Sequence, residues 1–246
     1  MAATTAMVAG CGGMRAGQIV AARSSVPAAG SPSTPTPTPT PPPPRAIDCA
    51  RTPCVALTFD DGPGEHTGRL LDDLRREGAR ATFFLLGQNV APHRDLVRRM
   101  ALEGHEVANH SWSHPQLTGM SPDAVRSQVR RTNEAVREAS GMTPTLFRPP
   151  YGATDGKVAR AVGMPQIMWS VDTLDWRDRS AARVARIGVR EPGKGGIVLL
   201  HDIHRTTVEA VPRMLSGLKK RGFTLVTVSE MFHGKQLRPG HKYKNR

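Results

Sequence analysis

Residues 55–63 read VALTFDDGP, an apolar run that ends in two adjacent carboxylates and a Gly-Pro pair. A short run of this kind, bounded by turn residues, is typical of a buried strand. The Gly-Pro pair predicts a sharp turn, which allows the side chains of Asp60 and Asp61 to reach the same place. Taken alone, the stretch also fits an acidic surface turn. The rest of the chain has to decide between these two interpretations.

Downstream of this stretch, short apolar segments alternate with amphipathic helical patterns, and no internal repeat is present. Ser121 and Pro122 mark the start of one helix as N-cap and first-turn residue, and Gly141 marks its end. Alternating strands and helices within one domain predict an α/β fold with a parallel sheet, either open or closed into a barrel. The predicted strands are residues 55–59, 81–86, 106–108, 145–147, 166–171, 197–200 and 224–228, and the predicted helices are residues 66–77, 90–103, 122–140 and 207–221.

The two aspartates after the first predicted strand and two histidines after the third together indicate a metal site. Neighbouring carboxylates repel each other, so one takes up a proton unless a cation separates them. Residues 109–114 read NHSWSH, which places His110 and His114 four residues apart, on one face of a predicted helical turn. With Asp61 they give two imidazoles and one carboxylate, with positions left for water and substrate, as in catalytic zinc sites. A histidine pair without this context more often serves as a cap or a surface feature.

Three further polar clusters follow the next predicted strands: RPPYG at 148–152, DTLDW at 172–176 and LLHD at 199–202. Each cluster alone fits a structural role, as a rigid turn, an acidic cap or a buried histidine. The carboxyl ends of parallel strands meet at one edge, where the chemistry of barrel enzymes gathers. Burying Asp, Arg and His together costs several kcal/mol unless they serve one another. The clusters as a set therefore predict a functional site.

These motifs resemble those of the polysaccharide deacetylase family, the carbohydrate esterases built on a NodB homology domain. TFDDGP, HSWSH, RPPYG, DTLDW and LLHD stand in the family's order from Thr58 to Asp202, and the resemblance covers nearly the whole chain after residue 44. It implies an α/β fold, a distorted seven-stranded (β/α) barrel. It also implies a divalent metal, usually zinc and sometimes cobalt or nickel, held by Asp61, His110 and His114.

The resemblance also assigns roles to the other motif residues. Asp60 would be the general base, paired with Arg148. His201 would be the general acid, oriented and tuned by Asp175. The backbone N–H of Tyr151 would help to bind the oxyanion. The pocket for the acetyl methyl group would be walled by Trp176 and Leu199.

The implied reaction removes N-acetyl groups from a polysaccharide that contains N-acetylglucosamine, either peptidoglycan or chitooligosaccharide, and releases acetate. Two alternatives stay open. The family uses the same machinery on esters, so an O-deacetylase acting on acetylxylan fits the same motifs. A catalytically silent glycan-binding protein is the second alternative, although silent members usually lose a ligand or the base, and Asp60, Asp61 and His201 are all present. Because the family is mostly monomeric, we expect a monomer.

The net charge of +13 would also suit a nucleic-acid partner. Most basic residues, however, cluster on predicted helix faces, as in the KKR run at 219–221, which is typical of a solvated surface. Aromatic residues make up only 4% of the chain, so no stacking platform for bases is evident. We therefore expect no nucleic-acid partner.

The first 44 residues read as a targeting segment and a spacer. Residues 1–10, MAATTAMVAG, resemble the end of a secretory signal, and with Cys11 they form a lipobox-like VAGC, which predicts lipidation; an Ala-rich tail is the alternative. Residues 31–44, SPSTPTPTPTPPPP, predict an extended, disordered linker. The expected organisation is a truncated signal or lipobox-like segment at 1–30, this linker, a catalytic domain at 45–232 and a basic tail at 233–246.

Cys49 and Cys54 flank the segment ARTP, where a turn at Thr52 and Pro53 would bring them together. In an exported protein such a pair predicts a disulfide, whereas in a reducing cytoplasm it would be two free thiols. No run of about 18 apolar residues is present, so no transmembrane helix is predicted. The spacer, Cys11 and the cysteine pair together predict an extracytoplasmic protein, secreted or lipid-anchored at the bacterial envelope, with membrane contact only through the lipid.

Overall fold

The computed structural model describes residues 7–10, 12–13 and 40–246. The chain divides into one unit at Met1–Thr38 and a second at Pro39–Arg246. Cys11 and linker residues 31–39 lie outside the described residues, as does most of the segment 1–30. The described residues of the first unit contain no helix or strand. In the described part of the chain, no helix is long and apolar enough to cross a membrane.

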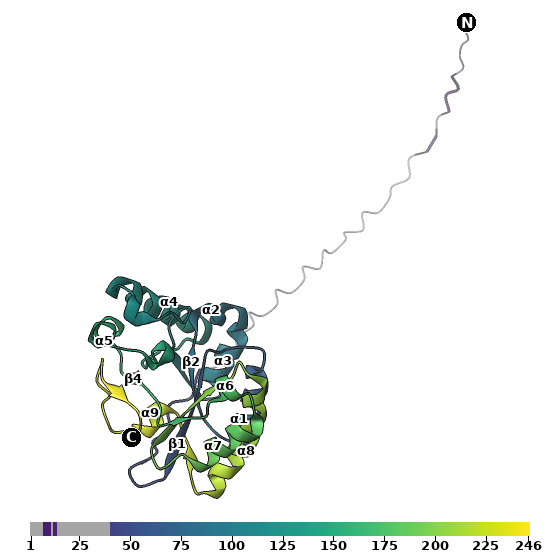
Figure 1. Cartoon of the computed structure of the whole chain (residues 1–246). Coiled ribbons are helices and arrows are strands. Elements are labelled where there is room, and N and C mark those ends of the chain that lie inside the picture. Colours follow the sequence, from purple (N-terminus) through teal and green to yellow (C-terminus); the bar gives the residue numbers. More distant parts are fainter. Residues whose placement is uncertain (1–6, 11, 14–39) are drawn as a thin grey trace. The chain divides into compact units, whose positions relative to one another are not determined.

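The second unit is an α/β fold around a parallel sheet, as predicted (Figure 1). Its central strand β1 (Cys54–Asp60) pairs along its whole length with β6 (Gly196–His201). The other edge of β1 pairs with β7 (Thr224–Leu225) near its start and with β2 (Thr82–Leu85) near its end. The order β3-β2-β1-β6-β5 is completed by β3 (Glu106–Asn109) and β5 (Val171–Asp172).

Beyond β3 the parallel pairing continues through a single residue. Phe147 forms bridges with Asn109 and with Gln166, the first residue of β4 (Gln166–Ile167). The predicted strand 145–147 is therefore reduced to one bridging residue, because prolines at 144, 149 and 150 flank it and cannot donate to a ladder. The predicted strand 166–171 is split into β4 and β5. The Arg148 guanidinium binds the carbonyls of Ile167 and Met168, which a continuous ladder would otherwise use.

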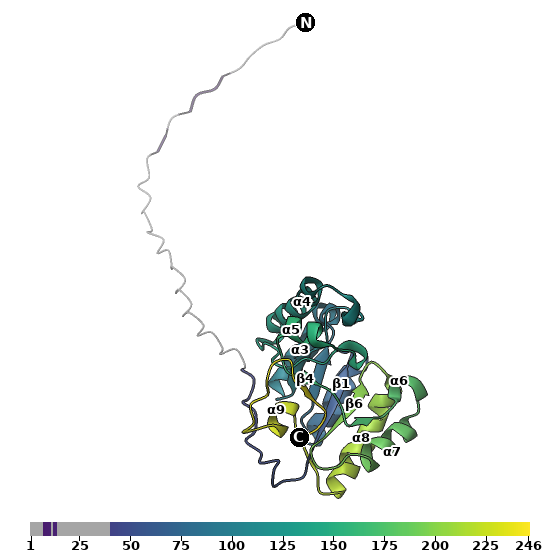
Figure 2. The same ribbon diagram turned by 60° about the vertical axis from the view of Figure 1, so that its left-hand side comes forward.

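The long helices α1, α3, α4, α7 and α8 pack on one face of the sheet, where their buried apolar residues share a single cluster with the strands. Along that face, α3 and α4 lie toward one edge of the sheet and α7 and α8 toward the other (Figure 2). The predicted helix 90–103 is broken at Pro92, where a 3-10 turn separates two helices. The predicted strand 224–228 ends early, because Thr227 and Glu230 form a capping box that starts a helix. The helices are α1 (Thr67–Arg76), α2 (Gly87–Val90), η1 (Ala91–His93), α3 (Arg94–Leu102), η2 (Leu117–Gly119), α4 (Pro122–Ser140), η3 (Pro150–Gly152), α5 (Gly156–Val162), α6 (Asp175–Asp178), α7 (Ala181–Arg190), α8 (Arg205–Lys220) and α9 (Val228–Met231).

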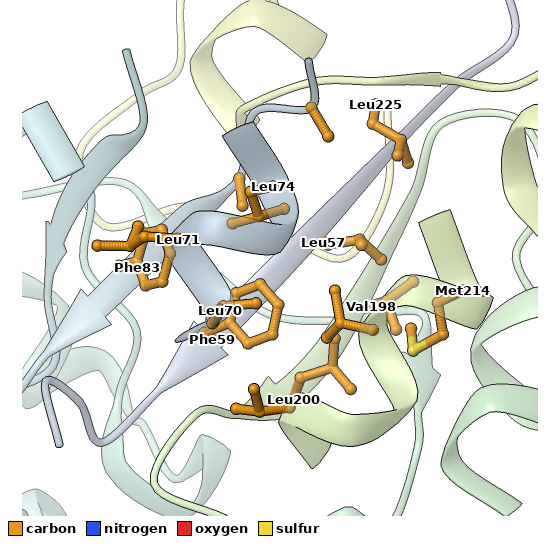
Figure 3. Packing of buried hydrophobic residues seen from close by; sticks show 14 of the residues in the cluster. Leu57, Phe59, Leu70, Leu71, Leu74, Phe83, Val198, Leu200, Met214 and Leu225 are labelled. Atoms are coloured by element: carbon orange, nitrogen blue, oxygen red, sulfur yellow. The ribbon is translucent and has the colours of Figure 1, made fainter. Parts of the chain in front are cut away.

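Strand β1 divides its side chains between two layers. Leu57 and Phe59 pack under α1 and α8 in the main hydrophobic cluster, part of which is drawn in Figure 3. Each fully buried side chain of this kind stabilises the fold by about 1.5–3 kcal/mol. Because successive residues of a strand point to opposite faces, Thr58 and Asp60 lie on the face of the sheet opposite to these helices, where both are buried. The apolar packing of β1 thus fixes the direction of the first carboxylate.

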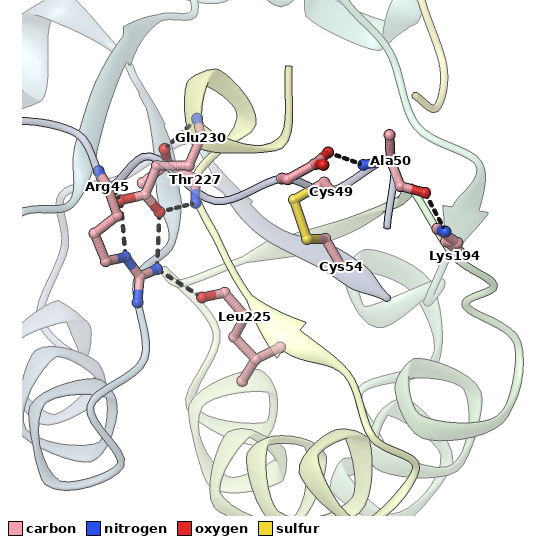
Figure 4. The surroundings of a disulfide bond; sticks show 9 residues. Arg45, Cys49, Ala50, Cys54, Lys194, Leu225, Thr227 and Glu230 are labelled. Atoms are coloured by element: carbon pink, nitrogen blue, oxygen red, sulfur yellow. Dashed lines mark hydrogen bonds and ion pairs between the residues drawn. A yellow bond between two sulfur atoms is a disulfide. The ribbon is translucent and has the colours of Figure 1, made fainter. Parts of the chain in front are cut away.

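The chain segment before β1 is tied to the domain by two interactions (Figure 4). Cys49 and Cys54 form a disulfide with Cα atoms 5.6 Å apart. Arg45 binds both carboxylate oxygens of Glu230, at 2.9 and 2.8 Å, and the carbonyl of Leu225 at 2.8 Å.

The segment 233–246, predicted as a basic tail, carries strand β8 (Lys242–Tyr243), which pairs with β4. The Tyr243 ring lies edge-on to the Phe232 ring, with centroids 5.6 Å apart. Part of this segment therefore packs on the domain.

Candidate active site

Asp61, His110 and His114 converge on one point. Each offers a ligand atom, and these atoms lie within 4.8 Å of one another. The Asp61 Oδ1 atom is 3.6 Å from Nε2 of each histidine, and it is buried without a hydrogen-bond partner. His110 Nδ1 lies 2.7 Å from the Arg148 carbonyl, to which its N–H donates, so the lone pair on Nε2 faces Asp61. A divalent cation fits this set, because it would satisfy the orphaned oxygen and both imidazole nitrogens.

Burial keeps the ring of His110 neutral. The side chain is 3% exposed, and desolvation lowers the pKa of His110 to about 3, against the opposing charge of Asp61. A neutral imidazole is the form that binds a metal.

The loop that carries both histidines is irregular, so the predicted helical turn at 110–114 is wrong. Ser111 and His114 have φ values of 72° and 60°, in the left-handed region, and these values bring the two rings to the same side. The side chain of Asn109 accepts from the Ser111 N–H at 2.8 Å. Gln128 of α4 accepts from the next two backbone N–H groups at 2.7 and 3.0 Å. Local side-chain bonds thus hold a conformation that helix spacing does not provide.

Asp60 lies beside this site and is held by a buried arginine. Arg148 Nη1 donates to Asp60 Oδ1 at 2.7 Å and to the Thr58 hydroxyl at 2.8 Å. The same guanidinium binds the carbonyls of Ile167 and Met168 at 3.0 and 3.1 Å. Burial raises the pKa of the Asp60 carboxyl, and the adjacent guanidinium of Arg148 opposes that rise. The second oxygen of Asp60, Oδ2, lies on the side of the metal ligands, 3.6 Å from His110 Nε2.

His201 stands across from Asp60, since the two are partners in the β1–β6 register. Its Nδ1 lies 2.9 Å from Asp175 Oδ1, and its backbone N–H donates to Asp175 Oδ2 at 2.7 Å. The Thr207 hydroxyl donates to the same Oδ2 at 2.7 Å. Burial by itself lowers the pKa of His201, but the hydrogen bond and charge of Asp175, with the charges of Asp60 and Asp61, raise it to about 9.

These groups line one pocket of about 480 Å³. The Tyr151 ring lies edge-on to His114 with centroids 4.4 Å apart and is 68% exposed at the rim. Trp176 is 47% exposed, whereas Leu199 is buried in the wall. Eight of the ten residues predicted for metal, catalysis and substrate line this pocket. The other two, Arg148 and Asp175, are fully buried and hold Asp60 and His201. The lining also includes four residues to which the sequence assigned no role: Pro149, Gly152, Trp169 and Asp172.

Comparison of the sequence and the fold with known proteins identifies the family of this chain. A family model described as polysaccharide deacetylase matches residues 48–167. The chain is 45% identical over 190 residues to the peptidoglycan-N-acetylglucosamine deacetylase PgdA of Listeria monocytogenes, covering 77% of this chain and 41% of that protein. A solved structure described as T48 deacetylase with substrate matches with a TM-score of 0.79 and 44% identity, over 80% of this chain and 100% of that one. The chain belongs to the polysaccharide deacetylase family.

A second similar solved structure is described as a family 4 acetyl xylan esterase from Clostridium thermocellum in complex with a cobalt ion. It matches with a TM-score of 0.75 and 35% identity, over 78% of this chain and 98% of that one. The predicted family and fold class are therefore confirmed. The chain spans about two fifths of the length of the Listeria relative.

Two residues that support this polysaccharide deacetylase site, Thr207 and Gln128, were missed from the sequence, and Asp202 of the LLHD cluster was given no role. Thr207 and Gln128 act on the motifs from distant helices and belong to no motif. Asp202, next to His201, is fully buried, and its Oδ2 accepts from the Thr67 hydroxyl. Its carboxylate lies so close to Gly62 that a Cβ atom there would have no room, which explains the glycine of the DDGP motif. Burial raises the pKa of Asp202 to about 7.

Proposed function

We propose that this protein is a metal-dependent deacetylase that removes N-acetyl groups from N-acetylglucosamine-containing polysaccharide and releases acetate. One observation carries the proposal. A three-residue ligand set, a carboxylate held by a buried arginine and a histidine held by a buried aspartate share a single pocket. Amide hydrolysis needs these three functions, namely an activated water, a proton acceptor and a proton donor.

A divalent cation held by Asp61, His110 and His114 would lower the pKa of a water molecule and polarise the acetyl carbonyl. Asp60 would accept the proton of the attacking water, since its second oxygen faces the ligand set while Arg148 holds the first. His201 would donate a proton from Nε2 to the departing nitrogen, because Asp175 occupies Nδ1 and favours the charged ring. The products would be acetate and a free amine.

The pocket walls fit a small acyl group. Leu199 and Trp176 would surround the acetyl methyl, and the backbone N–H of Tyr151 would donate to the oxyanion. A single donor of this kind typically contributes about 3–4 kcal/mol to transition-state stabilisation. The exposed rings of Tyr151 and Trp176 leave the rim open to a polymer chain.

We propose zinc as the resident metal, with cobalt or nickel as substitutes, because two imidazoles and one carboxylate with open positions suit zinc. The place of action would be extracytoplasmic, with the protein secreted or lipid-anchored through Cys11, and it would act as a monomer. The catalytic domain would begin near Arg45. The name of the Listeria relative supports peptidoglycan as the substrate.

The second candidate is an O-deacetylase acting on acetylxylan, supported by the similarity to the Clostridium esterase. The leaving group of an ester is an alkoxide, which needs less protonation by an acid than the nitrogen of an amide does. Ester hydrolysis would therefore depend less on His201 than amide hydrolysis would.

The experiment measures acetate released from N-acetylglucosamine pentamer, peptidoglycan and acetylxylan, with metal-stripped and zinc-restored protein. Asp60→Asn removes the proposed base and is expected to abolish release. Asp95→Asn, an exposed change on α3, is the matched control and should leave the rate unchanged. Release from acetylxylan alone would select the second candidate. No release from any polymer, by folded protein with zinc bound, would overturn the proposal and favour a silent glycan-binding protein.

A further inference from the structure

Helices α7 and α8 lie side by side on the outside of the sheet (Figure 2) and form a groove of about 630 Å³. Its basic lining residues are Arg183, Arg186 and Arg190 from α7, with Arg213 and Lys220 from α8, and no carboxylate lines it. We propose that this groove binds a linear phosphodiester polymer without bases, of the kind found in bacterial cell walls.

The first observation is that most of these charges are unpaired. Arg183 binds Asp178 at 2.8 Å. Within residues 40–246, the other four basic side chains of the groove form no ion pair, and all are exposed. A strongly basic groove without internal carboxylates attracts anions from solution.

A second groove, along α4, shows what an ordinary solvated face looks like in the same molecule. Its lining contains Asp123 and Glu134 beside the arginines. Arg126 pairs with Asp123, and Arg130 pairs with Glu134 at 3.0 Å. Two of the three arginines that line the α4 groove are thus neutralised by carboxylates of the same helix, so the α7–α8 groove is not a mere consequence of the basic composition.

The charges of the α7–α8 groove form two rows. Arg183, Arg186 and Arg190 are three and four residues apart, so they lie along one side of α7. Arg213 and Lys220 are seven residues apart on α8, and each row extends over about 10 Å at 1.5 Å per residue. One small anion would reach only part of this length. A chain of phosphodiesters would meet both rows.

The floor of the groove is tightly packed. A Cβ atom at Gly217 would approach Val189 Cγ2 to 2.7 Å, and a Cβ atom at Gly188 would collide with Met214. The two helices are thus held close, and the rows keep a fixed separation. A fixed, concave surface suits one extended chain better than the flat surface of a membrane.

No aromatic residue is among those that line the groove, so it offers no stacking surface for bases. Arginine and lysine bind phosphate oxygens well through charge-assisted hydrogen bonds. The choice of a wall polymer among base-free phosphodiesters rests on the proposed function. α7 and α8 begin six and four residues after Asp175 and His201, so the groove starts near the catalytic edge and runs away from it. Binding there would hold the protein on the wall and leave the pocket open.

The test uses the full chain with zinc and purified poly(glycerol phosphate), with binding measured by isothermal titration at several salt concentrations. The groove variant is R186E/R190E/K220E. Its matched control is R51E/R98E/R160E, which changes the net charge equally at exposed residues outside the groove. We expect the groove variant to lose roughly tenfold or more in affinity, and its slope of log K against log salt to fall by about 2 relative to the unmodified protein. The control should lose far less.

Three outcomes would overturn the proposal: no binding, an equal loss in both variants, or a preference for single-stranded DNA or anionic lipid vesicles over the polymer. Acetate release from the neutral N-acetylglucosamine pentamer is measured in parallel and should be equal in all three proteins. That release reports on the proposed function separately, so either idea can fail without the other.

Discussion

Replacing Asp175 by asparagine should move the alkaline limit of activity to lower pH. The pKa of His201 is raised from its ordinary value of 6.5 to about 9, and Asp175 is the largest favourable cause. That difference corresponds to on the order of 3 kcal/mol in favour of the charged ring. As the proposed proton donor, His201 would act only while it is protonated, so activity is expected to fall as the pH rises through its pKa.

Asparagine has almost the same shape as aspartate, but it would disfavour the proton on His201 Nδ1 that aspartate favours. One orientation of the amide keeps the acceptor for the His201 N–H and the Thr207 hydroxyl, and then turns its NH₂ group toward His201 Nδ1. That donor favours the neutral ring. Burial, which lowers the pKa of His201, is then no longer outweighed. We expect the alkaline limb of kcat/KM to move down by about two pH units or more.

The assay is the pH dependence of kcat/KM for acetate release by the zinc-loaded proteins. A cation held by Asp61, His110 and His114 would act on His201 equally in both proteins, so the difference between them is expected to remain. Asp178→Asn is the matched control, because Asp178 lies on the same helix and pairs with Arg177 and Arg183 instead. An alkaline limb at the same pH in the unmodified protein and in Asp175→Asn would refute the reasoning, as would an equal shift in the control.

The same pair also predicts a pH dependence of stability. The folded pKa of His201 lies above the ordinary value, so its contribution to the free energy of unfolding is fully present below pH 6.5 and is lost as the pH rises through about 9. The difference in Tm between the unmodified protein and Asp175→Asn should therefore be largest below pH 6.5, decrease as the pH rises from 6.5 to about 9, and be smallest above pH 9.

Two other changes test the supports of the site. Arg148→Met leaves Asp60 buried without its cation, so the free energy of unfolding in urea should fall by about 3–5 kcal/mol. Because Arg148 lowers the pKa of Asp60, the acid limb of kcat/KM should also move to higher pH, and an unchanged limb would contradict the pairing. Gln128→Ala removes two hydrogen bonds from the histidine loop and should weaken zinc affinity by about tenfold or more in chelator competition. Gln116→Ala, an exposed change that leaves the loop bonds intact, should bind zinc normally.

The ends of the strands could be predicted from the sequence because the signals there are local. The apolar run before Asp60 and the alternation of patterns require a buried parallel strand. Polar residues that directly follow such strands must meet at one edge. Eight of the residues that line the pocket were therefore predicted without knowledge of the pairing order. The start and end of α4 could also be predicted, because their signals are local. The Ser121 side chain accepts from the Ala124 N–H at the start, and Gly141 has a φ of 75° at the end.

Predictions failed where a distant side chain overrides a local preference. The β-rich stretch 166–171 has the composition of one strand, but its middle carbonyls are taken by the guanidinium of Arg148. The spacing of His110 and His114 fits a helical turn, but Gln128 and Asn109 stabilise a loop with left-handed residues instead. Arg148 and Gln128 are 19 and 15–16 residues away from the segments that they alter, and only the bond of Asn109 is local.

Both failures involve the residues that serve the site, and this has a physical cause. Arg148 cannot bind Asp60 in the interior unless the rest of its guanidinium is satisfied, since an unpaired buried donor costs about 1–3 kcal/mol. The carbonyls of Ile167 and Met168 satisfy it only if the strand there is interrupted. Likewise, His110 and His114 face one aspartate oxygen here through a loop with two left-handed residues, whose backbone N–H groups need side-chain acceptors. The fold thus gives up regular structure at the points where the buried polar groups need partners, and there local propensity stops predicting the backbone.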